Sequence, residues 1–394
     1  MGISFLLIII LNMAKKSKVG LKVPTKNELL RKYGESIKLA SETKETKLWL
    51  PSTFFALNYQ WGGGIPFGKS VEVAGEESSG KSLIAYNFAY ATQQLGGHVI
   101  WVDAEQSWMN SWAEANGVDP DKVTVINDTR IEYVSDAVAD IAIYIRSQLT
   151  HNEPILLVVD SIAAMDCSDN IDSKMVDGKS EMGGRAKALY KYFRIRTELF
   201  VKLGITQIYI NQLRTALNVG FGKDNTTTTG GAALKFYASI RVAFYAGRSI
   251  TVKHKGKERK AGKLVTIRLL KNKVAPPRPT ISKCPVYFNP KFHEVGFDRV
   301  FALEDTLVEN DIIEKNAGGT YSYKGKKLCR GEEKFQKLLE EDDDLRRKLL
   351  RKAEINTIGT TRKKLEALGD VNYFPVDGVE YESQNDEEED YEEE

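Results

Sequence analysis

The sequence predicts an α/β fold built around a mainly parallel sheet. Between Ser70 and about Pro276, short apolar runs typical of strands alternate with longer runs that have helical spacing. Such alternation indicates parallel strands covered by helices on both faces, and the near-continuous apolar character of the runs agrees with this. The expected strands have the sequences VEVAG, HVIWVDAE, KVTVIND, ILLVVDS, TQIYIN, SIRVAFYA and KLVTIRLLKNK.

The sequence also predicts how the chain is divided around this core. Residues 25–48 hold a short amphipathic helix, TKNELLRKYGESIKLA, and form an arm that packs either on another subunit or on its own core. The core takes residues 49–280, and the APPRP stretch breaks its pattern. A smaller α+β domain follows at residues 281–370, with YSYKGKKL as a hairpin. Residues 371–394 form an acidic disordered tail.

The first residues of the chain differ from the rest because they are strongly apolar. Residues 1–24 combine the apolar run ISFLLIIIL with a basic leader, and we expect them to be disordered. The apolar run is too short to span a bilayer, and no basic residue precedes it as in a signal peptide. Met13 resembles a natural start, which makes the run an upstream extension; a membrane anchor is the alternative.

Composition narrows the classes of protein further. The chain is 42% hydrophobic and 28% charged, as in soluble globular proteins. Its three cysteines are widely spaced and its four histidines are dispersed, which argues against a zinc site or a disulfide framework. The net charge of +2 hides an acidic end, DEEEDYEEE, on a basic body. This asymmetry suggests a polyanionic partner, although the tail could also serve solubility alone.

One motif carries the strongest signal. The stretch GEESSGKS fits the Walker A pattern G-x-x-x-x-G-K-[ST], between an apolar strand and a helix. Its glycines let backbone N–H groups approach phosphates, its lysine reaches the β- and γ-phosphates, and its last serine can bind Mg²⁺. An ordinary glycine-rich turn is the alternative. The predicted nucleotide-binding residues are Gly75, Glu76, Glu77, Ser78, Ser79, Gly80, Lys81, Ser82 and Leu83.

Polar residues at the ends of other strands extend this site. ILLVVDS places Asp160 where a Walker B carboxylate would serve Mg²⁺ together with Ser82. HVIWVDAE ends with Asp103 and Glu105, either of which could polarise an attacking water. Trp112 could stack on adenine or be an ordinary packed aromatic. TQIYINQLR ends in polar side chains that could sense the γ-phosphate.

Two polar stretches leave the same edge of the predicted sheet. DCSDNIDSKMVDGKSEMGG follows the Walker B strand, and a glycine- and threonine-rich stretch spans Asn218 to Gly231. Polar stretches of this length have little to bury and are usually functional or disordered loops. Because both leave the nucleotide-facing edge, they could carry a nucleotide-dependent switch.

Taken in order, these segments resemble the RecA family of bacterial recombinases. The resemblance rests on GEESSGKS, WVDAEQ, VVDSIAAM, SEMGGRAKAL, INQLR, TTTTGGAALKFYASIR, LLKNKVAPP and AGGTYSYKGKKL, which cover residues 25–330. The sequence is more similar to a bacteriophage-encoded RecA than to a typical bacterial one. Met109 and Trp112 depart from the family's usual Asp and Tyr in the adenine-contacting segment, which leaves nucleotide preference open.

The resemblance implies a role for each matching residue. Glu105 falls on the catalytic glutamate, Gln212 on the γ-phosphate-sensing glutamine, and Lys271 and Lys273 on lysines that reach ATP across a subunit interface. Lys81 and Ser82 keep their Walker A roles, and Phe236 matches a residue that links subunits. The implied DNA-binding residues are Met182, Gly183, Lys187, Arg194, Arg214, Phe221, Gly230 and Gly231.

The resemblance also implies an activity. It indicates a RecA-like P-loop ATPase core with an N-terminal polymerisation arm and a small C-terminal domain. Such a protein forms ATP- and Mg²⁺-dependent helical filaments on single-stranded DNA and exchanges strands with a homologous duplex. A single-strand-binding protein or loading factors are candidate further partners, no membrane partner is expected, and the location is the cytoplasm, of the host cell if the protein is phage-encoded. A hexameric helicase-type motor and a non-hydrolysing mediator remain the alternatives.

Overall fold

The computed structural model describes residues 24–33, 48–149, 152–172, 183–215, 226–298 and 300–357. The chain divides into two units, residues 1–46 and 47–394. In the first unit, helix α2 (Lys26–Tyr33) lies within the predicted arm. It starts with a capping box, in which the Glu28 carboxylate accepts from the Thr25 backbone N–H at 2.7 Å and the Thr25 hydroxyl accepts from the Glu28 N–H at 3.3 Å.

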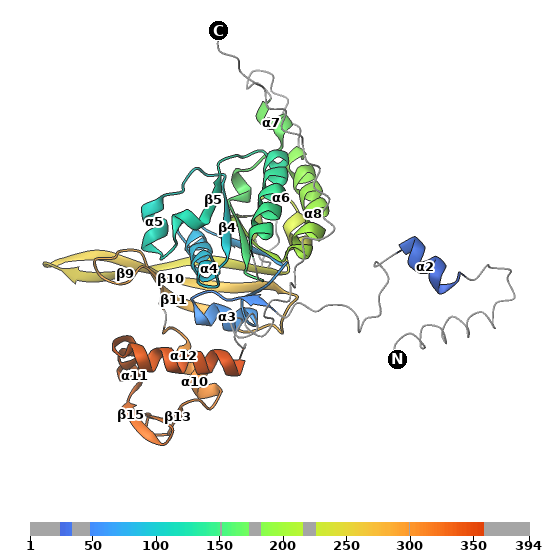
Figure 1. Cartoon of the computed structure of the whole chain (residues 1–394). Coiled ribbons are helices and arrows are strands. Elements are labelled where there is room, and N and C mark those ends of the chain that lie inside the picture. The colour runs from blue at the N-terminus through green and yellow to red at the C-terminus, as the bar shows by residue number, and fades with distance from the viewer. Residues whose placement is uncertain are drawn as a thin grey trace, which may run out of the picture. The chain divides into compact units, whose positions relative to one another are not determined.

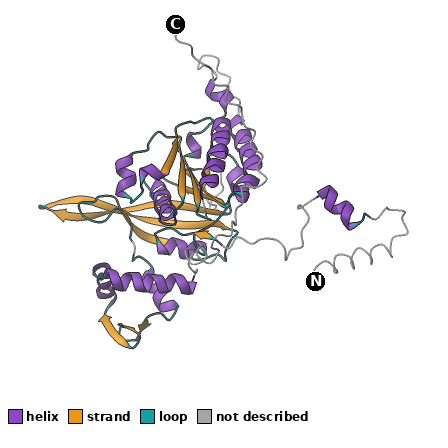
Figure 2. Cartoon of the chain, viewed as in Figure 1, coloured by secondary structure: helices purple, strands orange, loops and turns teal. Residues whose placement is uncertain are grey.

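The second unit is built on a ten-stranded sheet with the order β12-β11-β10-β9-β3-β7-β6-β4-β5, with β8 paired to β7 (Figures 1 and 2). Neighbouring strands from β9 to β5 in this order are parallel, and the other pairs are antiparallel. The predicted α/β fold with a mainly parallel central sheet is thus confirmed. The strands are β3 (Ser70–Gly75), β4 (His98–Asp103), β5 (Val123–Ile126), β6 (Ile155–Asp160), β7 (Ile205–Thr215), β8 (Thr226–Thr228), β9 (Ile240–His254), β10 (Lys257–Asn272), β11 (Ile281–Tyr287) and β12 (Gly296–Phe297).

Helices cover both faces of the parallel part, which explains why its strands read as continuous apolar runs. Alternate residues of one strand enter different cores: Leu156 and Val158 of β6 pack beneath α4 (Lys81–Gln94), whereas Leu157 and Val159 pack beneath α6 (Ile131–Gln148) and α8 (Gly184–Lys202). Every residue of β3 and β6 is buried. Both faces of these two strands are therefore shielded from water.

The antiparallel part departs from the helix-covered pattern. Strands β9 and β10 form a hairpin whose register runs from Ile240 opposite Asn272 to His254 opposite Lys257. In Figure 1 the outer ends of these strands, in yellow, extend beyond the helices. Strands β11 and β12 continue the sheet to Phe297, past residue 280, the predicted end of the core. The division of the chain at that residue stays a prediction.

A small C-terminal region has its own core. Helices α10 (Leu303–Glu309), α11 (Glu332–Glu341) and α12 (Asp343–Thr357) pack with strands β13 (Glu314–Lys315), β14 (Thr320–Tyr323) and β15 (Lys326–Arg330). Tyr321 stacks on Phe335 with ring centroids 4.5 Å apart. Phe55 of α3 (Phe55–Trp61) joins the same cluster and ties it to the sheet-bearing part. Strands β14 and β15 form a hairpin that includes YSYKGKKL and extends by one residue before it and two after it. Among the helices that the structure describes, none is long and apolar enough to cross a bilayer.

Candidate functional site

The sheet brings the polar strand ends together at one edge. In the register of β3 and β7, Gly75 lies opposite Gln212, and in that of β4 and β6, Asp103 lies opposite Asp160. Because neighbouring strands here are parallel, their carboxyl ends share this edge, which is where ligands bind in open α/β sheets. The residues predicted from separate motifs therefore meet in one region.

The Walker A segment wraps tightly between β3 and α4. Ser78 and Gly80 have positive φ angles of 54° and 90°. The Ser79 hydroxyl donates to the Glu76 carbonyl at 2.8 Å, and the Lys81 ammonium donates to the same carbonyl at 2.6 Å. A side chain at Gly75 would place its Cβ 2.6 Å from the Ser79 hydroxyl and 2.8 Å from the Phe244 carbonyl. This geometry leaves the first N–H groups of α4 facing the turn, as in anion-binding loops.

Two side-chain oxygen atoms, from Ser82 and Asp160, lie within hydrogen-bond distance of each other below this loop. The Ser82 hydroxyl donates to the Asp160 carboxylate at 2.8 Å. Asp160 is only 5% exposed, and this burial, together with the nearby charges of Glu105 and Asp103, raises its pKa to about 6. A hydroxyl and a carboxylate are hard oxygen donors of the kind that Mg²⁺ selects, so the pair fits that ion.

Lys81 lies in the same electrostatic environment. Burial lowers the pKa of its ammonium group, and the carboxylates of Asp160 and Glu105 oppose that effect. The ammonium is therefore held near several negative groups, in a partly desolvated position. Such a cation can interact with phosphate oxygens, and because it is partly desolvated, water competes less for it.

The structure separates the roles of the two acids that follow β4. Both oxygens of Asp103 accept backbone N–H bonds at 2.9 Å, one from Ser107 and one from Trp108, so this carboxylate holds the turn. Glu105 is exposed, its backbone N–H donates to the Asp160 carbonyl at 3.3 Å, and its carboxylate accepts from the Ser161 hydroxyl. The peptide bond between Asp160 and Ser161 is cis. Of the two acids, Glu105 is the one whose carboxylate is open to a reactant.

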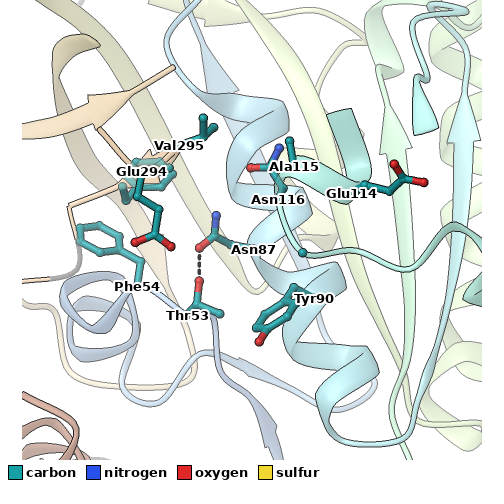
Figure 3. A pocket seen from close by; sticks show the side chains of 12 residues that line it. Thr53, Phe54, Asn87, Tyr90, Glu114, Ala115, Asn116, Glu294 and Val295 are labelled. Carbon is teal, nitrogen blue, oxygen red and sulfur yellow. Dashed lines mark hydrogen bonds between the residues drawn. The ribbon is translucent and has the colours of Figure 1, made fainter. Parts of the chain in front are cut away.

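Trp112 lies on α5 (Asn110–Ala115), half-buried against the core beneath α4. Beside it is a cavity of about 270 Å³ between α4, α5 and the segment before β12. Figure 3 shows the side chains of Asn87, Tyr90 and Glu294 around this cavity, with Thr53 hydrogen-bonded to Asn87. Trp112 is not among the lining residues. Its stacking on a base stays a prediction.

Sequence reasoning missed a buried polar network behind the site. Glu72, fully buried in β3, accepts from the Asn211 amide at 2.9 Å and from the Arg241 guanidinium. Asn211 accepts in turn from the Thr229 hydroxyl at 2.5 Å and from the backbone N–H of Gln212 at 2.9 Å. The signal that could have found it was a carboxylate and a guanidinium in strands expected to be buried, because buried charges need partners.

Six of the eight predicted DNA-binding residues fall into three groups, and the other two are Gly230 and Gly231. Gly183 and Lys187 lie at the start of α8 and Arg194 is exposed further along it. Arg214 is exposed in β7 opposite Thr227. Met182 and Phe221 lie outside the described residues.

The second loop ends at Gly230 and Gly231, beside helix α8. Both glycines have positive φ angles, of 86° and 76°. A Cβ at Gly230 would lie 2.9 Å from Leu189, and one at Gly231 would lie 3.3 Å from Ala186, both on α8. The end of the second loop therefore packs against the helix that follows the first loop.

The two lysines of KNK lie at the end of β10. The Lys271 ammonium donates to the carbonyls of Lys235 and Phe236 at 2.7 and 3.2 Å, at the end of α9 (Ala233–Tyr237). Within the described residues, neither Lys271 nor Lys273 hydrogen-bonds to residues 75–83 of the same chain. Phe236 is 67% exposed. Their role across a subunit interface stays a prediction.

Comparison of the chain with known proteins identifies its family. Residues 25–289 match the model of the RecA N-terminal domain. Protein RecA of Saccharopolyspora erythraea is 34% identical over 318 residues, which cover 80% of this chain and 86% of that protein. Protein RecA of Porphyromonas gingivalis strain W83 is 34% identical over 329 residues (81% and 88%), and that of a Picosynechococcus species is 31% identical over 322 residues (81% and 86%). The resemblance inferred from the motifs is confirmed, and the chain belongs to the RecA family.

Proposed function

We propose that the protein is a DNA-dependent ATPase that forms filaments on single-stranded DNA and catalyses homologous pairing and strand exchange. The observation that carries the proposal is the meeting of Ser82, Asp160 and Glu105 at one sheet edge, beside the Walker A turn. This set supplies an ion site, a phosphate cradle and an open carboxylate. The family membership and the residues flanking the two loops support the DNA-linked part.

The chemistry follows from the positions of these side chains. Ser82 and Asp160 would hold Mg²⁺, and the ion would neutralise charge that develops on the β- and γ-phosphate oxygens. The Walker A N–H groups and Lys81 orient the phosphates of ATP. Glu105 accepts a hydrogen bond from the attacking water and aligns it with the γ-phosphorus. The Ser161 hydroxyl fixes the Glu105 carboxylate for this task.

A link from nucleotide to DNA runs along β7. Gln212 lies opposite Gly75 of the phosphate-binding strand, and Arg214 follows two residues later, toward the second loop. We assign Gln212 to sensing the γ-phosphate and the loop-flanking lysine, arginines and glycines to the DNA backbone. The amino-acid sequence contains no evident element that would read bases, so we expect DNA to be bound largely independently of its base sequence.

Assembly completes the proposal. Lys271 and Lys273 reach the ATP of a neighbouring protomer, and the exposed Phe236 contacts that protomer near the same site. Residues 25–48 act as the polymerisation arm, and residues 281–370 as the small C-terminal domain. A single-strand-binding protein or loading factors are proposed further partners, and the proposed location is the cytoplasm, of a host cell if the gene is a bacteriophage's.

The test is ATP hydrolysis by the purified chain with and without single-stranded DNA, beside Glu105→Gln. We expect DNA to stimulate hydrolysis and the variant to lose about 100-fold or more of the rate, because it keeps the shape of the side chain but cannot act as a base. Asp140→Asn, the same kind of change at an exposed position of α6, is the matched control and should keep the native rate.

Three outcomes would contradict the proposal. Hydrolysis that ignores DNA would break the link between the loops and the nucleotide site. DNA binding without hydrolysis would favour a mediator that uses ATP structurally. Stimulated hydrolysis by closed hexameric rings that unwind duplex DNA would favour a helicase-type motor.

A further inference from the structure

The outer end of the β9–β10 hairpin is strongly basic. The eight residues around its turn, KHKGKERK from Lys253 to Lys260, form a segment that we call the basic ribbon. Five of its eight residues are lysine or arginine and one, Glu258, is acidic. All six of these charged side chains are exposed. The basic residues are Lys253, Lys255, Lys257, Arg259 and Lys260.

These charges have no ionic partners within the part of the chain that the structure describes. Lys253 and Glu258 are directly opposite in the strand register, yet no ion pair forms between them. Some exposed lysines elsewhere are paired: Lys202 with Glu198 at 3.1 Å and Lys337 with Glu341 at 3.6 Å. A concentration of unneutralised positive charge on one projection favours a polyanionic ligand.

The backbone of the basic ribbon gives it a defined form. It closes with a two-residue turn, Lys255 and Gly256, whose φ angles of 51° and 74° are those of a tight hairpin turn. Beyond the reach of β11, it consists of two strands only. The ring of His254, directly before the turn, contacts that of Phe292 with centroids 5.5 Å apart, so one side of the ribbon is supported near its tip by the segment that follows β11. A two-stranded ribbon is narrow enough to enter the major groove of B-form DNA.

We infer that the basic ribbon binds the phosphate backbone of duplex DNA, at a site separate from the two loops flanking β7 and α8. The inference rests on the proposed function only in taking DNA as the polyanion. Lysines act as point charges, so contacts of this kind hold a duplex without reading its sequence.

Duplex DNA fits the basic ribbon better than the other polyanions. A duplex carries one negative charge per about 1.7 Å of helix axis, a higher density than a single strand offers. Single strands are usually held by exposed aromatic side chains that stack on bases, and residues 253–260 contain no phenylalanine, tyrosine or tryptophan. An acidic protein segment would instead favour arginine with paired hydrogen bonds, and four of the five basic residues are lysine.

A second explanation for exposed lysines has to be separated from this one. Lysine on a free strand edge also prevents unwanted pairing with other chains. That role predicts self-association on removal of the lysines and no change in DNA binding. The experiment below distinguishes the two.

The experiment measures binding of a fluorescein-labelled 40-base-pair duplex of random sequence to the full-length chain, with Mg²⁺ and a non-hydrolysable ATP analogue. It compares the native chain with Lys253→Gln/Lys257→Gln/Lys260→Gln at several salt concentrations. The matched control is Lys122→Gln/Lys202→Gln/Lys337→Gln, which removes the same charge from three lysines that pair with acidic residues. Lys255 is left intact because of its positive φ angle.

We expect the ribbon variant to lose about tenfold or more in duplex affinity, and the slope of log K against log salt to fall by about one per lysine removed. The control should keep the native affinity within about twofold. A second variant, Lys253→Arg/Lys257→Arg/Lys260→Arg, should bind as the native chain does, because it keeps the charges.

Four results would overturn the inference. The first two are unchanged duplex affinity in the ribbon variant and an equal loss of duplex affinity in the control. The other two come from measuring a single strand of the same length and a peptide with the sequence of residues 386–394. They are an equal loss of single-strand affinity in the ribbon variant, and a loss that affects the peptide but not the duplex. Single-stranded DNA-stimulated ATP hydrolysis, measured on the same preparations, tests the proposed function separately. If the native chain lacks that stimulation, the proposed function fails and the duplex measurement still decides on the basic ribbon.

Discussion

Strand β9 carries charge at both of its ends and uses it in opposite ways. Near its start, Arg241 is largely buried and donates to the fully buried Glu72, which also accepts from Asn211. At its other end, Lys253 is exposed and has no ionic partner among the described residues. The difference lies in what covers the strand, since β3 flanks β9 at the start and only β10 flanks it at the tip.

This contrast shows where charge contributes to folding and where it is available to a ligand. A buried pair is costly to desolvate, and removal of one partner leaves the other charge buried and unpaired. An exposed lysine is solvated in the folded and the unfolded state, so its removal changes stability little. Three predictions test that reading, from the largest expected effect to the smallest.

The largest effect is expected for Glu72→Gln. The substitution leaves the Arg241 guanidinium without its carboxylate in a buried position, and we expect the free energy of unfolding to fall by about 3–5 kcal/mol. Urea denaturation followed by circular dichroism measures it. The matched control is Glu258→Gln, at the exposed end of the same hairpin, which should change the free energy by less than about 0.5 kcal/mol. Equal losses in the two variants would remove the distinction between the ends of β9.

An intermediate effect is expected at His98, which is half-buried at the start of β4 and contacts the Thr124 hydroxyl at 2.9 Å. Burial lowers its pKa from the ordinary value of 6.5, so the folded state binds a proton less tightly than the unfolded state. Its contribution to stability is therefore complete above pH 6.5 and is lost as the pH falls below that value.

Unfolding free energies of the native chain and His98→Gln, measured from about pH 7.5 to about pH 5, check this sign. The native chain should lose stability relative to the variant as the pH falls. A difference that stays constant over this range, or one that grows in the opposite direction, would show that the half-buried imidazole does not behave as a desolvated base.

The smallest effect is expected for the ribbon variant Lys253→Gln/Lys257→Gln/Lys260→Gln. Its free energy of unfolding should stay within about 0.5 kcal/mol of the native value, because these side chains are exposed to solvent and form no ion pair among the described residues. Thermal or urea unfolding measures it. A loss of several kcal/mol would mean that the lysines support the hairpin itself, and the two ends of β9 would then differ less than their burial indicates.

Much of the fold followed from local sequence patterns. The continuous apolar runs predicted the parallel strands because both faces of those strands are buried, and the structure confirms the mainly parallel sheet. Strand β11 was not predicted. Its sequence ISKCPVY contains a proline and a charged residue, which is tolerated because β11 pairs with β10 on one side and with β12 over only two residues on the other.

Some residues of the candidate site could likewise be predicted from local patterns, and others could not. The Walker A turn, Asp160 and Glu105 are local signals, because each lies at or just after the end of a strand that periodicity alone could locate. The roles of Glu72 and Asn211 depend on hydrogen bonds between residues 139 positions apart, and Asp103 turned out to be held by its own backbone turn. Such long-range pairing depends on strand order and register, which no single segment of the sequence determines.

The turn at Lys255 and Gly256 has a practical consequence. Nothing lies within 4 Å of a Cβ placed at Gly256, and the register shows no strand bond beyond His254 and Lys257. A short peptide inserted there would cross no core and break no ladder, so the hairpin tip is a permissive point in the chain. A tag, a spectroscopic label or a new pair of chain termini could be introduced at the tip while the sheet below keeps its register.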